Sequence, residues 1–380
     1  MRDLSAIIVR APLRISFAGG GTDLPAYYVS YGGLVVSAAI DRYCYVVATE
    51  RSDRSIRIDS ADYQVSHVLA PGEVPGVEEP LILPKAVVEW FAARGLLEGG
   101  VDLSLASDVP PGTGLGSSSA MAVALIRALT SCAAVPASPA GIAELASRLE
   151  IERLGMPIGK QDQYASAFGG INSIRFTADG VAVEPVDIPR RVVRDLASRL
   201  MLFSTGRSRR SSEILQQQKI DTGVNPRVTE SLHQLKALAG AVLRALTEED
   251  LDRFGRLLDE GWQLKKQLSG KISSAKIDRC YEAARSAGAL GGKITGAGGG
   301  GFLLLYCPIR QQEAVRSALA AHNLHEMPFA FDFQGAQVVA GGSAIRPSAA
   351  VGVLQEPARS TSRMWREVIH VRAQGTNAET

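Results

Sequence analysis

Hydrophobic and polar positions along this chain form short apolar runs and longer segments with helical spacing. Continuous or alternating apolar residues indicate strands, whereas apolar residues three or four positions apart indicate amphipathic helices. We predict strands over residues 7–15, 34–40, 43–49, 101–107, 170–176, 200–204 and 302–307. We predict helices over residues 24–30, 84–94, 118–133, 141–154, 211–218, 227–246, 251–268, 277–287 and 311–322. Strands and helices that do not alternate regularly favour an α+β fold.

A proline-bounded stretch at residues 185–189 predicts a domain boundary. The 380 residues are enough for two domains, each with its own core. We therefore predict an N-terminal domain over residues 1–185 and a C-terminal domain over residues 186–345. From about residue 346 prolines and serines become frequent, so residues 346–380 are predicted to form a weakly ordered tail.

The most informative segment reads DVPPGTGLGSSSA over residues 108–120 and leads into a predicted helix. Glycine has no Cβ, so its backbone N–H group can approach an anion closely. The serines are expected to cap the helix, whose N-terminus adds free N–H groups and a partial positive charge. These features predict a polyphosphate site in which a serine hydroxyl can also reach magnesium. The lysine of the common phosphate loop is absent, and a flexible turn feeding a core helix is the alternative.

Two further glycine-rich segments lie beside predicted strands, which weakens that alternative. One reads AGGGTD over residues 18–23, after the first strand, and the other reads KITGAGGGG over residues 293–301, before the last strand. The later segment matches the G-x-G-x-x-G pattern of dinucleotide-binding folds. It lacks the helix and the acidic ribose partner that should follow, so that interpretation fails on context.

Composition and charge narrow the classes of protein. A formal net charge of +2 gives no electrostatic drive towards nucleic acid or a membrane surface. The four cysteines occur singly in apolar contexts, which is typical of reduced residues in a cytoplasmic protein. No apolar run is long enough to span a bilayer, and the five histidines form no metal-ligand or hydrolase spacing. We expect a cytoplasmic enzyme or binding protein with small-molecule partners. The sequence leaves open whether the protein forms a homo-oligomer.

These glycine-rich blocks resemble the three motifs of the GHMP kinases, the family of galactokinase, homoserine kinase and mevalonate kinase. APLR with GGGTD resembles the first motif, residues 110–120 the second and residues 293–301 the third, so that the resemblance covers about residues 5–342. The nearest subgroup is the bacterial D-glycero-D-manno-heptose 7-phosphate kinases, which share LRISF-x-GGGTD and GKQDQYA. The resemblance implies a two-domain fold with a ribosomal-protein-like N-terminal half and a ferredoxin-like C-terminal half.

The resemblance also implies that ATP and Mg²⁺ are bound. Ser118 would contact the metal, with Ser117 and Ser119 as less favoured choices. The acidic ligand would be Glu150, five residues before a glycine; Glu152 is the alternative and points to a different helix face. The ATP phosphates would lie on Pro111, Gly112, Thr113, Gly114, Leu115, Gly116, Ser117, Ser118 and Ser119.

Two charged residues match the catalytic positions of the family. Asp162, in GKQDQYA, would orient or deprotonate the acceptor hydroxyl; otherwise it would be a helix cap. Arg14 lies among apolar strand residues and would stabilise charge on the transferred phosphoryl group; otherwise it would face solvent. Phosphoryl transfer needs such positioning and charge neutralisation more than covalent help from the protein.

The acceptor would be held by the first and third motifs and by a basic segment after the predicted boundary. Asp23 is the predicted ligand of sugar hydroxyls, with a turn aspartate that caps the next helix as the alternative. The segment STGRSRRSS at residues 204–212 offers arginines to a sugar phosphate, with Lys160 and Lys293 as weaker candidates. The full predicted acceptor set is Gly20, Gly21, Thr22, Asp23, Arg207, Ser208, Arg209, Gly298 and Gly299.

The reaction implied by the resemblance is transfer of the γ-phosphate of ATP to the C1 hydroxyl of D-glycero-D-manno-heptose 7-phosphate. That reaction belongs to the synthesis of nucleotide-activated heptose for surface polysaccharide. A kinase of the same family acting on free galactose or fucose is the first alternative. A non-catalytic nucleotide or sugar sensor on the same fold is the second, against which the joint presence of Arg14, Glu150 and Asp162 argues.

Overall fold

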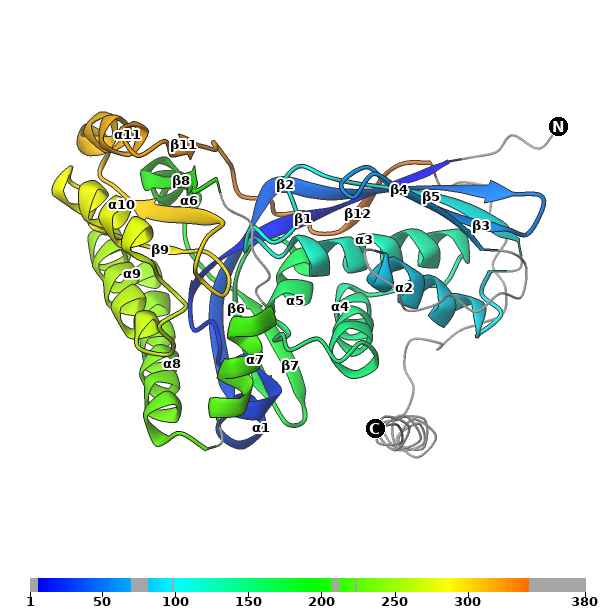
Figure 1. The fold of residues 1–380 in the computed structure, drawn as a ribbon, viewed down its shortest axis with the longest axis horizontal. Helices are drawn as coiled ribbons and strands as arrows, with labels where there is room; N and C mark the ends of the chain where they lie inside the picture. Colours follow the sequence, from blue (N-terminus) through cyan, green and yellow to red (C-terminus); the bar gives the residue numbers. More distant parts are fainter. Residues whose placement is uncertain (1–5, 70–80, 98, 207–211, 223, 342–380) are drawn as a thin grey trace, which may run out of the picture.

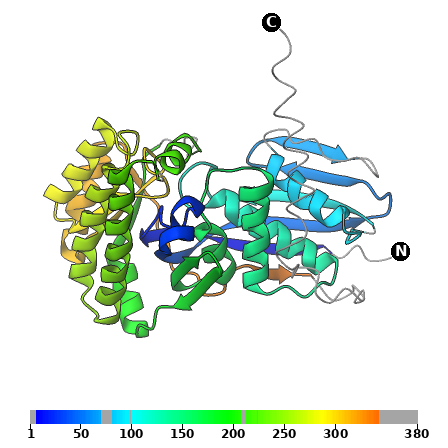
Figure 2. The same cartoon turned by 90° about the horizontal axis from the view of Figure 1, so that it is seen from below.

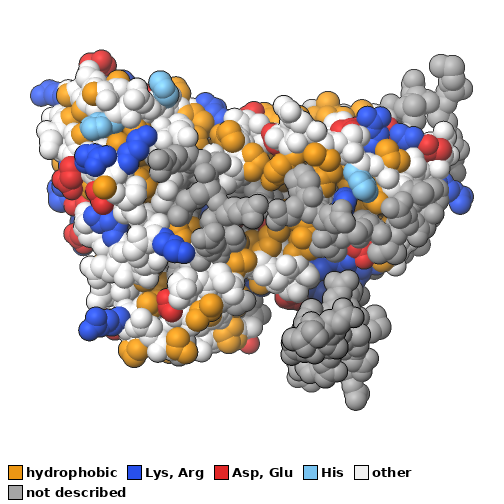
Figure 3. All heavy atoms as spheres, viewed as in Figure 1, with side chains coloured by type: hydrophobic (Ala, Val, Ile, Leu, Met, Phe, Trp, Pro, Cys, Tyr) orange, Lys and Arg blue, Asp and Glu red, His pale blue; other side chains and the backbone are white. Residues whose placement is uncertain are grey.

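A computed structural model describes the chain except residues 1–5, 70–80, 98, 207–211, 223 and 342–380. Two sheets lie at opposite ends of the molecule, and helices pack against both (Figures 1 and 2). This arrangement confirms the predicted α+β class. The predicted tail at 346–380 lies outside the described residues. On the face drawn in Figure 3, acidic and basic side chains are interspersed over the described surface.

The first sheet has eight strands and is built around a long antiparallel pair. β1 (Ile7–Ala18) and β2 (Gly33–Arg51) form this pair, and β2 continues to β5 (Gly100–Ser107), β3 (Ile56–Ser60) and β4 (Val65–Leu69). β6 (Ile171–Thr177) pairs with the first half of β2 and with β7 (Gly180–Pro185). Four helices lie along one face of this sheet (Figure 1), namely α2 (Ile82–Ala92), α3 (Ser117–Cys132), α4 (Pro139–Ser147) and α5 (Gln161–Phe168).

Two predicted strands, 34–40 and 43–49, are one continuous strand in the structure. β2 passes through both, and its register against β1 shifts where Leu13 faces Ile40 but Pro12 faces Tyr43. The two extra residues of β2 form a bulge, and a bulge bends a strand without ending it. The polar pair Asp41-Arg42 therefore marks an irregularity in the pairing rather than a turn.

The second sheet is antiparallel and has the order β11-β8-β10-β9. Its strands are β8 (Leu200–Ser204), β9 (Gly291–Ile294), β10 (Phe302–Tyr306) and β11 (His325–Glu326). The helices of this half are α6 (Arg190–Arg199), α7 (Ser212–Asp221), α8 (Pro226–Thr247), α9 (Leu251–Lys266), α10 (Ala275–Ser286) and α11 (Gln312–Ala320), with a short 3₁₀ turn at Ile309–Gln311. Most of these helices match the predicted ranges within a few residues.

Side chains of the two halves share one hydrophobic cluster. Leu13 and Phe17 of β1 pack with Val242 of α8 and Phe254 of α9, and the rings of Phe17 and Phe254 meet edge to face at 5.2 Å. β12 (Gln337–Ala340) also returns from the C-terminal part to pair with β1. The division into residues 1–185 and 186–345 stays a prediction, and β12 is a segment of the second range that completes the first sheet.

The predicted helix over residues 141–154 is confirmed, but its second half has a different helical geometry. α4 ends at Ser147, and residues Arg148–Arg153 continue as a π-helical turn. A π turn widens the helix by one residue and is frequent at functional sites. Among the described residues, no helix combines the length and the apolar character that crossing a membrane requires.

Close backbone contact between α9 and β9 gives a test of this packing. A Cβ on Gly291 would overlap the carbonyl oxygen of Gly255, whereas a Cβ on Gly270 would meet no atom within 4 Å. We expect Gly291→Ala to lower the free energy of unfolding by about 2 kcal/mol, because backbone atoms cannot move aside independently. Urea unfolding of both variants measures this. Equal midpoints for Gly291→Ala and the control Gly270→Ala would contradict the packing.

Candidate active site

A cleft opens where the glycine-rich loop, the N-terminus of α3, the π turn and the second sheet meet. Segments far apart in the sequence line it, which only tertiary folding can bring together. Its lining residues include Arg14, Ser16, Gly20, Gly21, Asp23, Gly112, Gly114, Gly116, Ser117, Ser118, Ser119, Glu150, Gln161, Asp162, Gln218, Lys265, Lys293, Gly296 and Ala297.

The glycine-rich loop presents backbone to this cleft. Gly112, Gly114 and Gly116 have φ values of 77°, 78° and 78°, a region that disfavours residues with a Cβ. Gly116, rather than a serine, is the N-cap of α3, and no side chain caps this helix. The expectation that the serines cap the helix is therefore wrong. Ser117–Ser119 form its first turn, whose N–H groups and dipole favour an anion.

Three members of the predicted phosphate set support this loop instead of lining the cleft. Leu115 is fully buried, and its carbonyl oxygen accepts a hydrogen bond of 3.0 Å from the N–H of Arg14. The Thr113 hydroxyl donates to the carbonyl of Pro110 at 3.0 Å. Pro111 is likewise not among the lining residues. The direct surface of the loop is therefore made by its glycines and serines.

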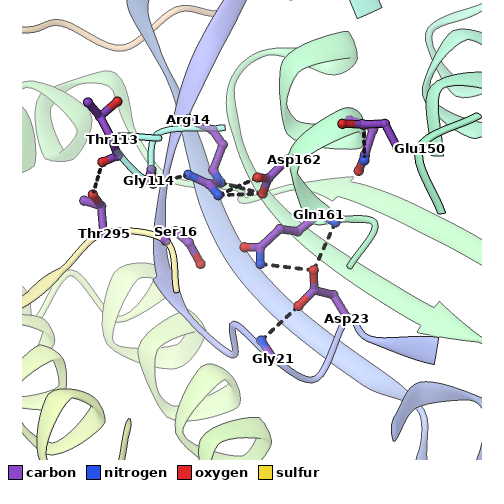
Figure 4. Close-up of polar contacts among 12 residues, drawn as sticks. Arg14, Ser16, Gly21, Asp23, Thr113, Gly114, Glu150, Gln161, Asp162 and Thr295 are labelled. Atoms are coloured by element: carbon purple, nitrogen blue, oxygen red, sulfur yellow. Dashed lines mark hydrogen bonds and ion pairs between the residues drawn. The ribbon is translucent and has the colours of Figure 1, made fainter. Parts of the chain in front are cut away.

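The third glycine block packs on the second. The Thr295 hydroxyl donates to the carbonyl oxygen of Thr113 at 3.3 Å (Figure 4), and a Cβ on Gly114 would lie 2.6 Å from the carbonyl oxygen of Thr295. A Cβ on Gly301 would overlap the Thr113 carbonyl. The two blocks thus need glycine because two backbones touch.

Arg14 and Asp162 form a bidentate ion pair at the centre of the cleft (Figure 4). Nε and Nη2 of Arg14 each donate to a different carboxylate oxygen of Asp162 at 2.7 Å. Nη1 donates to the carbonyl oxygen of Gly114 at 2.8 Å. The Arg14 side chain is 4% exposed and that of Asp162 is 23% exposed, so the carboxylate is the member that faces an incoming molecule.

Glu150 lies in the π turn beside the first turn of α3. Its Oε1 accepts from the Ser118 hydroxyl at 3.2 Å, and its Oε2 accepts from Nε2 of Gln163 at 2.6 Å. Complete burial raises the pKa of Glu150 to about 7. Glu152 is exposed and does not line the cleft. The geometry therefore separates the two glutamates and places Glu150 beside the predicted serine ligand.

Asp23 is buried and already hydrogen-bonded (Figure 4). Its Oδ1 accepts from the N–H of Gly21 at 2.9 Å, and its Oδ2 accepts from the N–H and Nε2 of Gln161 at 3.2 and 3.0 Å. Burial, and then the nearby negative charge of Asp162, raise the pKa of Asp23 above 3.8. Asp23 is not the cap of α1 (Pro25–Tyr31), whose N-cap is Leu24. It holds Gln161 in place and lines the cleft, and its assignment to sugar hydroxyls stays a prediction.

Other members of the predicted acceptor set divide into three groups. Gly20 and Gly21 line the cleft. Thr22 does not: it is fully buried, and its hydroxyl donates to the carbonyls of Gly19 and Leu34 at 2.8 and 3.0 Å, so its role is to fold the turn. Outside the described residues lie Arg207, Ser208 and Arg209.

Gly298 and Gly299 also lie away from the cleft. The N–H of Gly299 donates to the carbonyl oxygen of Ile272 at 2.6 Å, and a Cβ on Gly298 would meet the same residue. Gly296 and Ala297 of this block line the cleft instead. The position of Gly298 and Gly299 therefore does not support their predicted contact with the substrate, because both glycines serve backbone packing.

The two candidate lysines differ in position. Lys160 forms an ion pair with Glu144 at 3.0 Å and does not line the cleft. Lys293 lines the cleft and is buried; its Nζ donates to the carbonyl oxygens of Ser16 and Phe17 at 2.9 and 3.4 Å. Burial, followed by the positive charges of Lys265 and Arg14, lowers the pKa of Lys293 well below 10.5. Three basic side chains, Arg14, Lys265 and Lys293, therefore line the cleft, and burial with their mutual repulsion disfavours the charged form of Lys293.

Sequence reasoning missed several polar residues of the cleft. Ser16 follows Arg14 by two positions on β1, and strand alternation places both side chains on one face, so this signal was present. Gln161 lines the cleft and precedes Asp162 directly, so its place in the GKQDQYA motif was a signal for it. Gln218 and Lys265 lie on helices of the other half, and no local pattern connects them with the site.

Comparisons with known proteins identify relatives of this chain. Two family models match it: GHMP kinases N terminal domain over residues 83–170 and GHMP kinases C terminal over residues 242–324. A D-glycero-alpha-D-manno-heptose 7-phosphate kinase of Campylobacter jejuni is 32% identical over 337 residues, covering 87% of this chain and 98% of that protein. A bifunctional fucokinase/GDP-fucose pyrophosphorylase of Arabidopsis thaliana is 27% identical over 83% of this chain and 31% of that protein.

A solved structure of a similar protein has a similar fold. The crystal structure of a D-glycero-D-manno-heptose 1-phosphate kinase from Bacteroides thetaiotaomicron has a TM-score of 0.74 and 30% identity. The match covers 90% of this chain and 100% of that one.

The raised pKa of Glu150 predicts a pH-dependent stability. Because the folded pKa lies near 7 and the ordinary value is 4.5, this group stabilises the fold fully below about pH 4.5 and progressively less up to pH 7. In EDTA, we expect the free energy of unfolding of the wild type to fall by roughly 3 kcal/mol between pH 4.5 and pH 8, relative to that of Glu150→Gln. Urea unfolding across this range measures the difference. The exposed control Glu152→Gln should follow the wild-type curve; a constant offset for Glu150→Gln would contradict the prediction.

Proposed function

The chain belongs to the GHMP kinase family, and from this membership we propose that it transfers the γ-phosphoryl group of ATP to a heptose phosphate. The observation that carries the proposal is the bidentate Arg14–Asp162 pair directly beside the glycine-rich loop. A phosphoryl donor bound at the loop and an acceptor hydroxyl at Asp162 would meet there. Both requirements of phosphoryl transfer, positioning and charge neutralisation, are met by residues of the cleft.

Each charged side chain has a distinct part in this proposal. Asp162 accepts a hydrogen bond from the acceptor hydroxyl and orients it; in a loose transition state the proton leaves late, so orientation is its larger contribution. Arg14 holds the carboxylate in place. It would supply positive charge near the transferred group, and Lys293 would add to this charge when a bound triphosphate favours its protonated form. The N–H groups of the glycine-rich loop and of Ser117–Ser119 receive the phosphates of ATP.

Magnesium fits the donor set of the cleft. Ser118 and Glu150 place a hydroxyl and a carboxylate oxygen 3.2 Å apart, and both are hard oxygen ligands. Burial leaves the Glu150 carboxylate costly to ionise, and a divalent cation would offset that cost. Among the described residues no cluster of three His, Cys, Asp or Glu could hold a metal alone. Mg²⁺ commonly takes one or two protein oxygens together with phosphates and water, and it would neutralise phosphate charge here.

The proposed acceptor is D-glycero-D-manno-heptose 7-phosphate, and the proposed position is its C1 hydroxyl. The relatives support a heptose phosphate: one is named for a heptose 7-phosphate and the other for a heptose 1-phosphate. Those names differ in the carbon that carries the phosphate, so the position is tested directly below. We also propose a cytoplasmic location, with which the four free cysteines agree.

A panel of acceptors tests the reaction. ADP release is measured with ATP, Mg²⁺ and heptose 7-phosphate, free heptose, galactose or fucose, and the product is examined by phosphorus NMR. We expect the highest kcat/KM with heptose 7-phosphate and a new phosphorus signal coupled to the anomeric proton. Higher kcat/KM with free galactose or fucose would reject the acceptor. Absence of turnover with every sugar would favour a nucleotide or sugar sensor.

Asp162→Asn tests the assigned role of the carboxylate. We expect kcat to fall by about 10³-fold, because the amide cannot accept the proton or carry the negative charge. The Kd for ATP, measured by calorimetry, should change less than about threefold, since the glycine-rich loop is intact. The exposed control Asp195→Asn should retain wild-type kcat. Loss of ATP binding by Asp162→Asn would assign this residue to the nucleotide instead.

A further inference from the structure

Three buried polar atoms around the cleft lack a hydrogen-bond partner among the described residues. They are Oγ of Ser16, Oε1 of Gln161 and Nε2 of Gln218, and all three residues line the cleft. A buried polar atom without a partner costs free energy, so such atoms in a binding cleft point to a ligand that completes them. β1, α5 and α7 contribute one atom each.

These atoms gather around the turn at Gly20 and Gly21, on the Asp23 side of the cleft. A Cβ on Gly20 would lie 3.5 Å from the Ser16 hydroxyl and 3.7 Å from Nε2 of Gln161. A Cβ on Gly21 would lie 2.5 Å from Nε2 of Gln218. Figure 4 shows Ser16 between Arg14 and the Gly21 turn, with its hydroxyl towards Gln161. Hence the absence of side chains at the turn lets these polar side chains approach its backbone closely.

We propose that Gln218 is a specificity-determining residue for the acceptor and that its Nε2 donates to a sugar hydroxyl, with Ser16 and Gln161 contacting further hydroxyls. This inference rests on the proposed sugar kinase function. The three atoms match a polyol because Nε2 of Gln218 only donates, Oε1 of Gln161 only accepts, and the Ser16 hydroxyl does both. None of them is charged, so they suit hydroxyls and not the phosphate of the sugar.

Gln218 reaches the cleft from the Gly21 side, on an element that carries neither member of the catalytic pair. It is 6% exposed on α7, whereas Arg14 and Asp162 come from β1 and α5. A donor on this side restrains the sugar from a second direction, and a site built to hydrogen-bond a hydroxyl discriminates strongly against analogues that lack it. Its neighbour Gln217 is exposed and donates to Asp221 at 3.0 Å on the same helix, which makes it a matched control.

The test compares Gln218→Met with Gln217→Met, using the best acceptor from the panel. Methionine keeps the length of the side chain and removes its hydrogen bond. We expect Gln218→Met to lower kcat/KM for the acceptor about 10-fold or more, with KM for ATP changed less than about twofold. Gln217→Met should retain wild-type values. Unchanged kcat/KM for Gln218→Met would overturn the assignment, and so would an equal loss in both variants.

Monodeoxy analogues of the acceptor show whether the variant and the substrate lose the same hydrogen bond, and the loss that each analogue causes is first measured with the wild type. We expect one analogue to lose about 10-fold in kcat/KM with the wild type and to lose nothing further with Gln218→Met, because the same hydrogen bond is absent in both cases. Independent, multiplicative losses for every analogue would overturn the proposal. Failure of the heptose phosphate assignment is visible separately, as poor turnover of that acceptor by the wild type.

Discussion

The contacts of the buried Arg14 guanidinium hold together the elements that form the cleft. A cation at 4% exposure is tolerated only with a partner and with its remaining N–H groups satisfied, and Asp162 and the Gly114 carbonyl together provide this. One side chain thereby joins β1, the glycine-rich loop and the start of α5. Because two nitrogens of the guanidinium bind the two carboxylate oxygens, the Asp162 carboxylate has a single orientation, and the proposed reaction centre would be set before any substrate binds.

Close backbone packing brings the second and third glycine-rich blocks to the same place. Thr113 and Gly114 touch Thr295 and Gly301 with no room for intervening side chains. The glycine-rich loop is consequently supported from the second sheet, although its helix belongs to the first. This explains why residues inside the motif, such as Thr113 and Leu115, stabilise the loop while its glycines and serines form the surface of the cleft.

Several buried groups of the cleft are in an unfavourable electrostatic environment that a bound ligand would improve. Burial raises the pKa of Glu150 and Asp23 and lowers that of Lys293, so each charged form is disfavoured in the protein alone. A triphosphate with a divalent cation carries the complementary charges. Among the described residues, Oγ of Ser16 and Nε2 of Gln218 likewise have no hydrogen-bond partner, and sugar hydroxyls would complete them. These buried groups thus lower the stability of the protein alone, and a ligand that pairs with them would gain affinity.

The sequence by itself determined the α+β class, most helices and the three glycine-rich blocks, because apolar spacing and glycine at fixed spacing are local signals. The resemblance of their motifs also pointed to Arg14, Glu150 and Asp162, which line one cleft in the structure. Tertiary structure alone decided which of two glutamates faces the cleft, because a π turn at Arg148–Arg153 sets their directions. It also turned Thr22 inward, assigned Gly298 to packing and brought Gln218 to the acceptor side. Those outcomes depend on contacts between residues distant along the chain, and no local pattern encodes such contacts.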